Sequence, residues 1–106
     1  MAEISLKFNP EFIPLILTGQ KSSTIRKEKK GKYEDTFRVA ETRFIIVSVI
    51  HDELCNLLKY YRREGFRSRQ NLYDVIKAIY PDVTLDTDMY LHRFERYDDF
   101  TNEVMQ

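Results

Sequence analysis

The sequence predicts an α+β fold, in which a curved, mostly antiparallel sheet carries helices at its periphery. Apolar residues recur with the two-residue period of strands towards both ends of the chain, and with the helical period between residues 54 and 79. The resulting order is strand, helix, three strands, two helices, strand, which is not the alternation that builds a parallel sheet. The 106 residues are enough for one domain. We therefore expect a single domain over residues 1–106, with its core over 3–96 and a polar tail over 97–106.

The first half of the chain opens with alternating apolar and polar residues from Ile4 to Phe8, which predict a strand. Asn9 and Pro10 then fit the cap and the first position of a helix that ends at Gly19. Pro14 removes a hydrogen bond inside that helix, so either its first turn is irregular or the regular helix starts near Pro14. Further strands are expected at residues 23–26, 36–40 and 43–51, with a charged loop at 27–33. The last of these strands is an apolar run typical of a strand covered on both faces.

The second half of the chain changes to the helical period. One helix is expected to begin after Asp52 and to break at Gly65, and a second is expected between Ser68 and Pro81. Asp52 and Ser68 both have side chains that cap helix N-termini. Residues 88–96 then alternate as a closing strand.

Charge is unevenly distributed although the net charge is zero. Residues 21–32 hold six basic side chains against one acidic, a local balance of +5. Residues 82–106 hold seven acidic side chains against two basic, a balance of −5. The basic segment is compatible with an anionic partner, and equally with an ordinary solvated loop.

Several kinds of site are excluded by counting. The three glycines stand singly, so there is no Gly-rich phosphate loop, and one cysteine with two histidines cannot supply the usual zinc spacing. We therefore expect no cofactor and no metal, and we interpret His92, between aromatic residues, as a packed histidine rather than a catalyst. Cys55 has no partner for an internal disulfide, and no signal peptide or long apolar run is present. These features predict a cytoplasmic protein without a membrane partner.

Two motifs carry a resemblance to a known family. Residues 17–26 read LTGQKSSTIR, an apolar helix end followed by Gly-x-Lys, small hydroxyl residues and Thr-Ile-Arg. The second motif, Glu64-Gly65-Phe66, precedes Ser68 and the helix that leads to Tyr80-Pro81. Together with the end of the closing strand, these motifs resemble the ASCH domains, relatives of the PUA fold, over residues 3–96. The resemblance implies a PUA-like curved β-barrel.

Within that family the chain looks most similar to small bacterial N(4)-acetylcytidine amidohydrolases. Such enzymes hydrolyse the amide on the exocyclic nitrogen of cytidine and give cytidine and acetate. The resemblance implies that Lys21 and Thr24 of the first motif and Glu64 of the second are catalytic.

Amide hydrolysis needs a nucleophile, a proton acceptor and a partner for the oxyanion. One hypothesis makes Thr24 the nucleophile, Lys21 its base or oxyanion partner, and Glu64 the acid/base. Lys21 is a base only if its pKa is lowered, to which Arg26 contributes a nearby cation. An equally workable hypothesis has water attack, activated by Glu64, while Thr24 and Lys21 bind the carbonyl oxygen.

A non-catalytic RNA- or nucleotide-binding module is the alternative function. The residues expected to bind substrate or RNA are Ser23, Arg26, Lys27, Lys29, Tyr33 and Phe66. Aromatic rings among basic side chains are typical of a surface that stacks splayed bases, without readout of a DNA sequence. A purely structural interpretation also exists, with Lys21 a solvated helix-end lysine, Thr24 an ordinary strand residue and Glu64 a surface charge.

Overall fold

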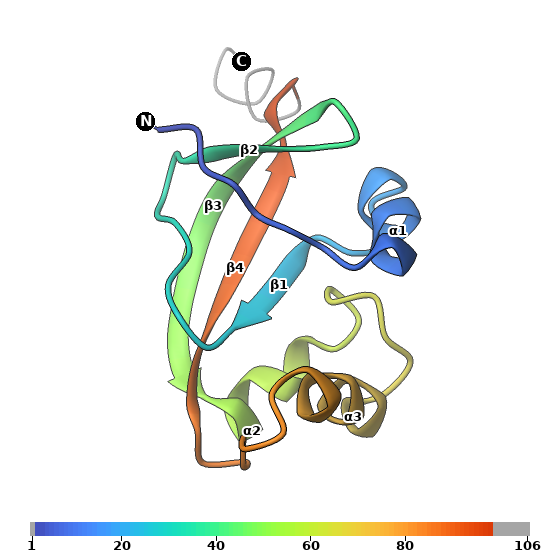
Figure 1. The fold of residues 1–106 in the computed structure, drawn as a ribbon, viewed down its shortest axis with the longest axis vertical. Coiled ribbons are helices and arrows are strands. Elements are labelled where there is room, and N and C mark those ends of the chain that lie inside the picture. The colour runs from blue at the N-terminus through green and yellow to red at the C-terminus, as the bar shows by residue number, and fades with distance from the viewer. Residues whose placement is uncertain (1, 99–106) are drawn as a thin grey trace.

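Four antiparallel strands form one curled sheet in the computed structural model, which describes residues 2–98 (Figure 1). The order of the strands across the sheet is β1-β4-β3-β2. The strands are β1 (Ser23–Arg26), β2 (Thr36–Val39), β3 (Thr42–Glu53) and β4 (Asp88–Arg96). The long central pair of β3 and β4 shifts register between Ile46 and Ser48. Such a bulge bends the strands and strengthens their twist, which gives the sheet the shape of a half-barrel. The predicted α+β class with a curved antiparallel sheet is confirmed.

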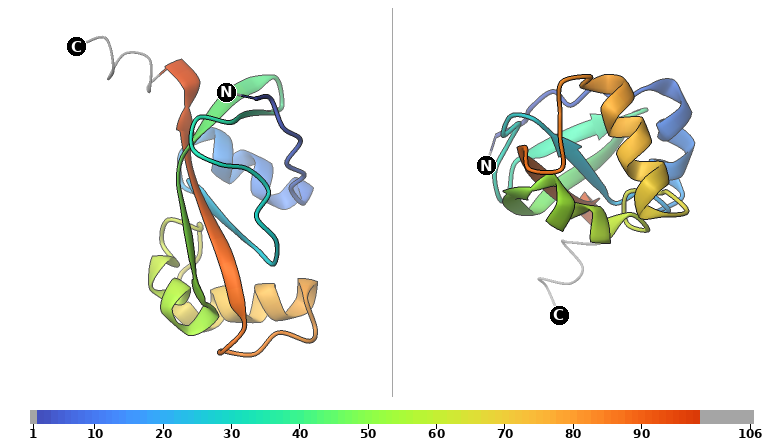
Figure 2. Two further views of the ribbon diagram at one scale, coloured as in Figure 1. Left: turned by 90° about the vertical axis from the view of Figure 1, so that its left-hand side faces the viewer. Right: turned by 90° about the horizontal axis from the view of Figure 1, so that it is seen from below.

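The helices lie at the ends of this sheet. Figures 1 and 2 place α2 and α3 together where β3 ends and β4 begins, and α1 farther along the sheet, towards the β2–β3 hairpin. The helical segments are η1 (Pro10–Phe12), α1 (Ile13–Leu17), α2 (Leu54–Leu57), η2 (Leu58–Tyr60) and α3 (Arg69–Ile79). Ser68 caps α3 as predicted, because its side-chain oxygen accepts a hydrogen bond from the Asn71 N–H at 3.0 Å. The irregular first turn that Pro14 predicted is the 3-10 turn η1.

Two hydrophobic clusters pack against the sheet and meet at one place. The first lies between the sheet, α2 and α3, and its buried members include Ile25, Leu54, Leu57, Leu72, Ile76, Met89 and Leu91. The second lies towards α1 and β2, and its buried members include Leu6, Ile16, Phe37, Phe44, Ile46 and Phe94. Phe66 packs against the first cluster and Phe12 against the second, and these two rings meet edge-on with their centroids 5.8 Å apart. The candidate site lies at this junction.

The predicted strand from Ile4 to Phe8 is wrong. This segment makes only an isolated parallel bridge between Glu3 and Thr36, through hydrogen bonds that involve residues 2 to 4. The alternation is nevertheless visible in burial, because Leu6 is buried while Ser5 and Lys7 are exposed. Farther along, the Lys7 carbonyl accepts a hydrogen bond from the Arg26 side chain at 2.7 Å instead of joining a strand ladder. The two-residue period therefore indicates correctly which side chains face inwards. It does not show that the backbone lacks a strand to pair with.

Two other boundaries differ from the predictions. β3 runs to Glu53, which is also the N-cap of α2, so Asp52 is not the cap. The Asp52 carboxylate instead accepts hydrogen bonds from the Glu53 N–H at 2.7 Å and the Asn56 side chain at 3.0 Å. β3 is buried on both faces only from Phe44 to Ile46, and the rest of it is partly exposed.

Of the predicted tail, residues 99–106 lie outside the described residues, and the single-domain boundary therefore stays a prediction. Between residues 2 and 98, no helix has the length and apolarity that a membrane crossing requires.

Candidate functional site

The first motif forms a sharp turn from α1 into β1. Gly19 follows the helix with φ +84°, a conformation that glycine adopts without a steric cost. The Lys21 N–H then donates to the Leu15 carbonyl at 2.9 Å. This bond folds the chain back against α1 and turns the Lys21 side chain into the interior, where it is 4% exposed.

The second motif is a turn that follows η2 and is tied to the start of β1. The Glu64 N–H donates to the Tyr60 carbonyl at 3.1 Å, and the Ser22 N–H donates to the Arg63 carbonyl at 2.8 Å. Gly65 has φ +92°, and a Cβ at this position would lie 3.3 Å from the Cβ of Lys21. Glycine therefore allows the turn to approach Lys21 closely, and Glu64 is buried beside it.

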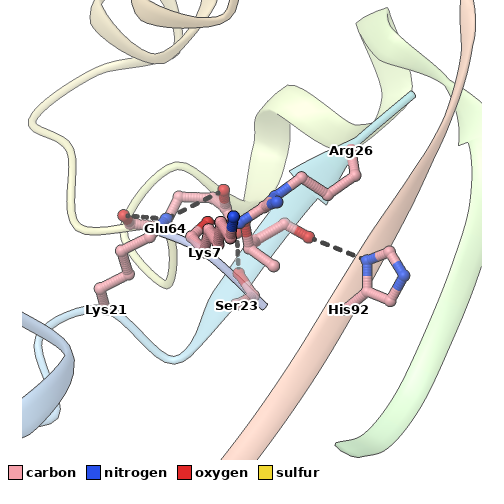
Figure 3. A network of polar contacts seen from close by, with 7 residues as sticks. Lys7, Lys21, Ser23, Arg26, Glu64 and His92 are labelled. Atoms are coloured by element: carbon pink, nitrogen blue, oxygen red, sulfur yellow. Dashed lines mark hydrogen bonds and ion pairs between the residues drawn. The ribbon is translucent and has the colours of Figure 1, made fainter. Parts of the chain in front are cut away.

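Lys21 and Glu64 form a buried ion pair (Figure 3). The Lys21 Nζ lies 3.4 Å from Glu64 Oε1 and donates to the Glu64 backbone carbonyl at 3.1 Å. The other carboxylate oxygen, Oε2, accepts a short hydrogen bond from the Ser23 hydroxyl. Both ions thus have hydrogen-bonding partners, which buried charges require.

Burial lowers the pKa of Lys21 below its usual value of 10.5, because the ammonium form loses its hydration. The Glu64 carboxylate opposes this shift through its charge and its hydrogen bond, and the nearby Arg26 cation adds to the lowering. Two aromatic rings complete the surroundings of the amine, with centroids 5.3 Å (Phe12) and 5.8 Å (Phe66) from Nζ. A lysine with a lowered pKa is a chemically competent base in a way that a solvated lysine is not.

Thr24 is held by Arg26 on the neighbouring part of β1. The Arg26 Nε donates to Thr24 Oγ1 at 3.0 Å, while its Nη2 is tied to the Lys7 carbonyl. The guanidinium carbon lies 5.1 Å from the centroid of the Phe8 ring. Since Thr24 Oγ1 accepts from Arg26, its own proton remains available for donation. Desolvation lowers the pKa of Arg26, opposed by Tyr80 and Glu64, and the group remains a cation near neutral pH.

A pocket of about 130 Å³ brings these groups to a common surface. Its polar side chains include Lys21, Thr24, Arg26 and Glu64. Its aromatic side chains are Phe8, Phe12, Phe66 and Tyr80. The remaining wall is one face of α3, formed by Leu72, Val75, Ile76 and Ile79. A cavity of this size is small beside the ~300–1,000 Å³ of drug-sized ligand sites, and suits a single small group such as one base or an acyl chain.

A second hollow, of about 560 Å³, lies between the end of α1 and the end of β4. Its lining includes Ile16, Phe94, Glu95 and Arg96. The larger volume does not make it the better candidate, because Lys21 lines both hollows, whereas Glu64 and Thr24 line the first pocket and not the second.

The structure brings five of the sequence-identified residues to the pocket and leaves three outside. Lys21, Thr24 and Glu64 are buried together, so their interpretation as solvated lysine and surface carboxylate is wrong. Arg26 and Phe66 also line the pocket, and Ser23 contacts it indirectly through Glu64. The three outside the pocket are Lys27, Lys29 and Tyr33.

The outlying residues have other surroundings. Lys27 forms an exposed ion pair with Asp82 at 2.7 Å, which joins the basic segment to the acidic one. Lys29 is exposed, and the Tyr33 side chain is 56% exposed. No base-stacking contact with the pocket is therefore available to Tyr33 in this conformation.

The sequence does not identify Phe8, Phe12, Tyr80 or the pocket-lining residues of α3 as site residues. Phe8 and Phe12 precede the first motif, and Tyr80 follows α3, so only the tertiary fold places them around Lys21. The apolar spacing of α3 is the available signal, and by itself it indicates a helix face turned towards the core. It is core for Leu72 and Ile76, but Val75 is only partly buried.

His92 of β4 is a packed histidine, as interpreted from the sequence. Its ring is fully buried, with Nε2 accepting the Lys30 N–H at 2.9 Å and Nδ1 lying 3.4 Å from the Thr24 carbonyl oxygen. Burial lowers the pKa of His92 below 6.5, and these two contacts fit a neutral ring protonated on Nδ1. Among residues 2–98, no three His, Cys, Asp or Glu side chains are grouped as a metal ion would require.

Comparisons with known proteins locate this arrangement among solved folds. No family model and no curated protein matches the chain. The hypothetical protein PH0355 superposes with a TM-score of 0.66 at 17% identity, over 90% of this chain and 97% of that one. An ASCH domain from Lactobacillus crispatus JV V101 gives 0.62 at 14% identity, over 90% and 78% of the two chains. Protein EF3133 from Enterococcus faecalis V583 gives 0.56 at 12% identity, over 91% and 78%. The chain therefore has the fold of an ASCH domain, as its two motifs suggested.

Proposed function

We propose that this protein hydrolyses the N-acyl bond of a cytidine-type nucleoside, giving cytidine and a carboxylic acid. The observation that carries the proposal is the buried Lys21–Glu64 pair, which shares a pocket with the Thr24 hydroxyl and the Arg26 guanidinium. Burying an ion pair is costly, and a buried lysine with a lowered pKa and a specific charge partner in a cleft is a candidate for a functional site. The motif resemblance to amidohydrolases supports a catalytic role for three of these residues, Lys21, Thr24 and Glu64.

In the route that the lowered Lys21 pKa favours, Thr24 is the nucleophile. Its Oγ1 attacks the acyl carbon, its proton passes to the uncharged Lys21 amine, and the carbonyl oxygen becomes an oxyanion beside Arg26. Collapse breaks the C–N bond as Lys21 returns the proton to the exocyclic nitrogen, and cytidine leaves. Water activated by Glu64 then hydrolyses the acyl ester on Thr24. Lys21 is bonded to Glu64, so its approach to Thr24 requires a side-chain rotation or one bridging water.

A second route uses water directly as the nucleophile. Glu64 removes a proton from water, and the Thr24 hydroxyl and the Lys21 ammonium bind the carbonyl oxygen. The two routes differ in a covalent intermediate, because only the first forms an acyl ester on Thr24. Rapid acid quenching followed by intact-mass measurement and peptide mapping separates them. The first route predicts an acylated Thr24 peptide during turnover, and its absence at saturating substrate favours the second.

The proposal as a whole is tested by incubating the purified protein with N(4)-acetylcytidine and following cytidine by chromatography. Thr24→Ser retains the hydroxyl and should retain measurable turnover, whereas Thr24→Val should abolish turnover by the first route and reduce it by at least about 100-fold by the second. If folded wild-type protein releases no cytidine, the proposed function is wrong.

RNA or nucleotide binding remains the second candidate function, and one surface favours it. Three basic side chains, Lys59, Arg62 and Arg63, lie over the rings of Tyr60 and Tyr61 at centroid distances of 5.2 to 5.7 Å. Such pairs can exchange their internal contacts for stacked bases and phosphates. Binding of this kind would weaken steeply with salt, whereas turnover of a neutral nucleoside in the buried pocket would change little. Titration of a labelled single-stranded RNA at two salt concentrations distinguishes the two functions.

A further inference from the structure

The pocket is divided into a polar side and an apolar wall. Lys21, Thr24 and Glu64 lie on the polar side, where the reacting carbonyl must be placed. The wall is the face of α3 formed by Leu72, Val75, Ile76 and Ile79, at the spacing of successive helical turns. We call this set the α3 wall. It contains no hydrogen-bonding side chain.

The α3 wall becomes more exposed towards the mouth of the pocket. Leu72 and Ile76 are 1% and 4% exposed, whereas Ile79 is 49% exposed, among the most exposed large apolar side chains of the described chain. Val75, which lies between them along the helix, is partly buried. A strip of apolar surface therefore runs from the interior to the solvent along one side of the pocket. An apolar ligand that covers its outer half removes this surface from water, which favours binding.

The chemistry of an N-acylated cytosine decides which part of the substrate lies on this strip. The base carries ring nitrogen and carbonyl groups that need hydrogen-bonding partners when they are buried, and the α3 wall offers none. Elsewhere the pocket lining offers the polar groups of Lys7, Asn9 and Tyr80, which suit the base and the ribose. A hydrocarbon chain needs no partners, so the acyl group is the part that fits the α3 wall.

We propose that the α3 wall is an acyl-chain site, and that the preferred substrates carry short aliphatic acyl groups longer than acetyl. This inference rests on the proposed function and specifies its substrate class. An acetyl group places a single methyl beyond the carbonyl, which leaves the outer wall at Val75 and Ile79 uncovered. A butyryl group adds two methylenes that extend along it.

The test compares N(4)-acetylcytidine with N(4)-butyrylcytidine. Each buried methylene contributes about a fourfold gain in transition-state binding, so the two methylenes of the butyryl substrate should raise kcat/KM about 15-fold. Val75→Thr keeps the size of the side chain and places a hydroxyl in the wall, and it should reduce the butyryl-to-acetyl ratio to about threefold or less. Ala78→Ser introduces a hydroxyl on an exposed part of the same helix, outside the pocket, and should leave the ratio unchanged.

The outcomes separate this inference from the proposed function. A wild-type enzyme that hydrolyses the acetyl substrate as fast as the butyryl one overturns the acyl-chain site and leaves the proposed function intact. If neither substrate is hydrolysed, the proposed function fails. A binding measurement then tests whether the α3 wall is an acyl-chain site. In that case, titration with butyramide should shift the methyl NMR signals of Val75, Ile76 and Ile79 at lower concentration than acetamide does. Equal shifts for the two amides would overturn the site independently of turnover.

Discussion

Lys21 and Glu64 are the residues on which the stability and the chemistry of the site both depend. Their side chains are 4% and 3% exposed, so each charge is compensated mainly by the other. The Ser23 hydroxyl and the Glu64 backbone carbonyl provide the remaining hydrogen bonds. Removing one partner of such a pair leaves an isolated buried charge, which costs more than losing the pair altogether.

Lys21→Met should therefore destabilise the protein strongly, by about 3–5 kcal/mol, because Glu64 loses its cation. Adding Glu64→Leu removes the isolated carboxylate and should recover much of that loss. Lys27→Met, which breaks the exposed pair with Asp82, is the matched control and should change stability little. Urea denaturation measures all three variants. Equal midpoints for Lys21→Met and wild type would show that the pair is not buried as described.

The lowered pKa of Lys21 gives the activity a defined dependence on pH. If Lys21 acts as a base, only its uncharged form is active, so kcat/KM should rise with pH and level off below the ordinary lysine value of 10.5. Glu64→Gln removes the charge that raises the Lys21 pKa, so in any residual activity the rise should move to lower pH. A rate that instead falls as Lys21 loses its proton would favour direct attack by water. A pH series of initial rates for wild type and Glu64→Gln distinguishes these cases.

At the scale of elements, two turns and the strand β1 bring the polar side chains of the pocket together. β1 supplies Thr24 and Arg26, but Lys21 and Glu64 both come from turns that contain a glycine of positive φ. These are Gly19 at +84° and Gly65 at +92°. They differ in their surroundings, because a Cβ at Gly19 would have nothing within 4 Å, while a Cβ at Gly65 would contact Lys21.

This difference provides a matched pair of substitutions. Gly19→Ala and Gly65→Ala should each lose about 1–2 kcal/mol of stability, because alanine is strained at positive φ. Only Gly65→Ala should also lower kcat, since its Cβ pushes on Lys21 and moves Glu64 by a few tenths of an ångström. Thermal denaturation and initial rates provide the two readouts. Equal activity losses in both variants would contradict the proposed role of the Glu64 turn.

β4 and the loop at residues 27–33 are joined by a contact that depends on protonation. The neutral His92 ring accepts the Lys30 N–H, and Arg26 and Lys29 add to the effect of burial in lowering its pKa. The unfolded ring has a pKa near 6.5, so its neutral-state contribution is present above that pH and is lost as the pH falls below it. Stability should thus decline with acidification, and the Lys30 amide should exchange faster. His92→Phe should show a flatter pH dependence in urea denaturation, and an unchanged slope would contradict this assignment.

At the scale of the whole molecule, the sheet positions the site by separating two cores that touch at Phe12 and Phe66. The two rings contact each other edge-on, and both lie within 6 Å of the Lys21 amine, which they help to shield from water. The oppositely charged segments that the sequence revealed also meet, through Lys27 and Asp82. Part of the basic segment is therefore neutralised within the molecule, which weakens the argument from local charge for an anionic partner.

The sequence predicted the elements and motif residues better than their environment. Local sequence patterns predicted the Ser68 cap and the closing strand, and the family resemblance identified Lys21 and Glu64. Each of these features is encoded by a few neighbouring residues. Other features depend on distant contacts, such as the α3 wall. The β2–β3 hairpin also lacks a local signal, since Ala40 and Glu41 adopt φ of 47° and 71° where Asn and Gly are usual. The pairing of Val39 with Thr42 leaves these two exposed residues to close the turn, so side-chain propensity alone does not predict it.

Cytidine release from N(4)-acetylcytidine by wild type, Thr24→Val and Lys29→Ala is the decisive test of the function assigned to this pocket. Wild type and Lys29→Ala, whose exposed lysine lies outside the pocket, should release cytidine, whereas Thr24→Val should release little or none. Circular dichroism confirms that each variant is folded. Turnover by Thr24→Val at the wild-type rate, or no turnover by the folded wild-type protein, would contradict the assignment of this pocket as an amidohydrolase site.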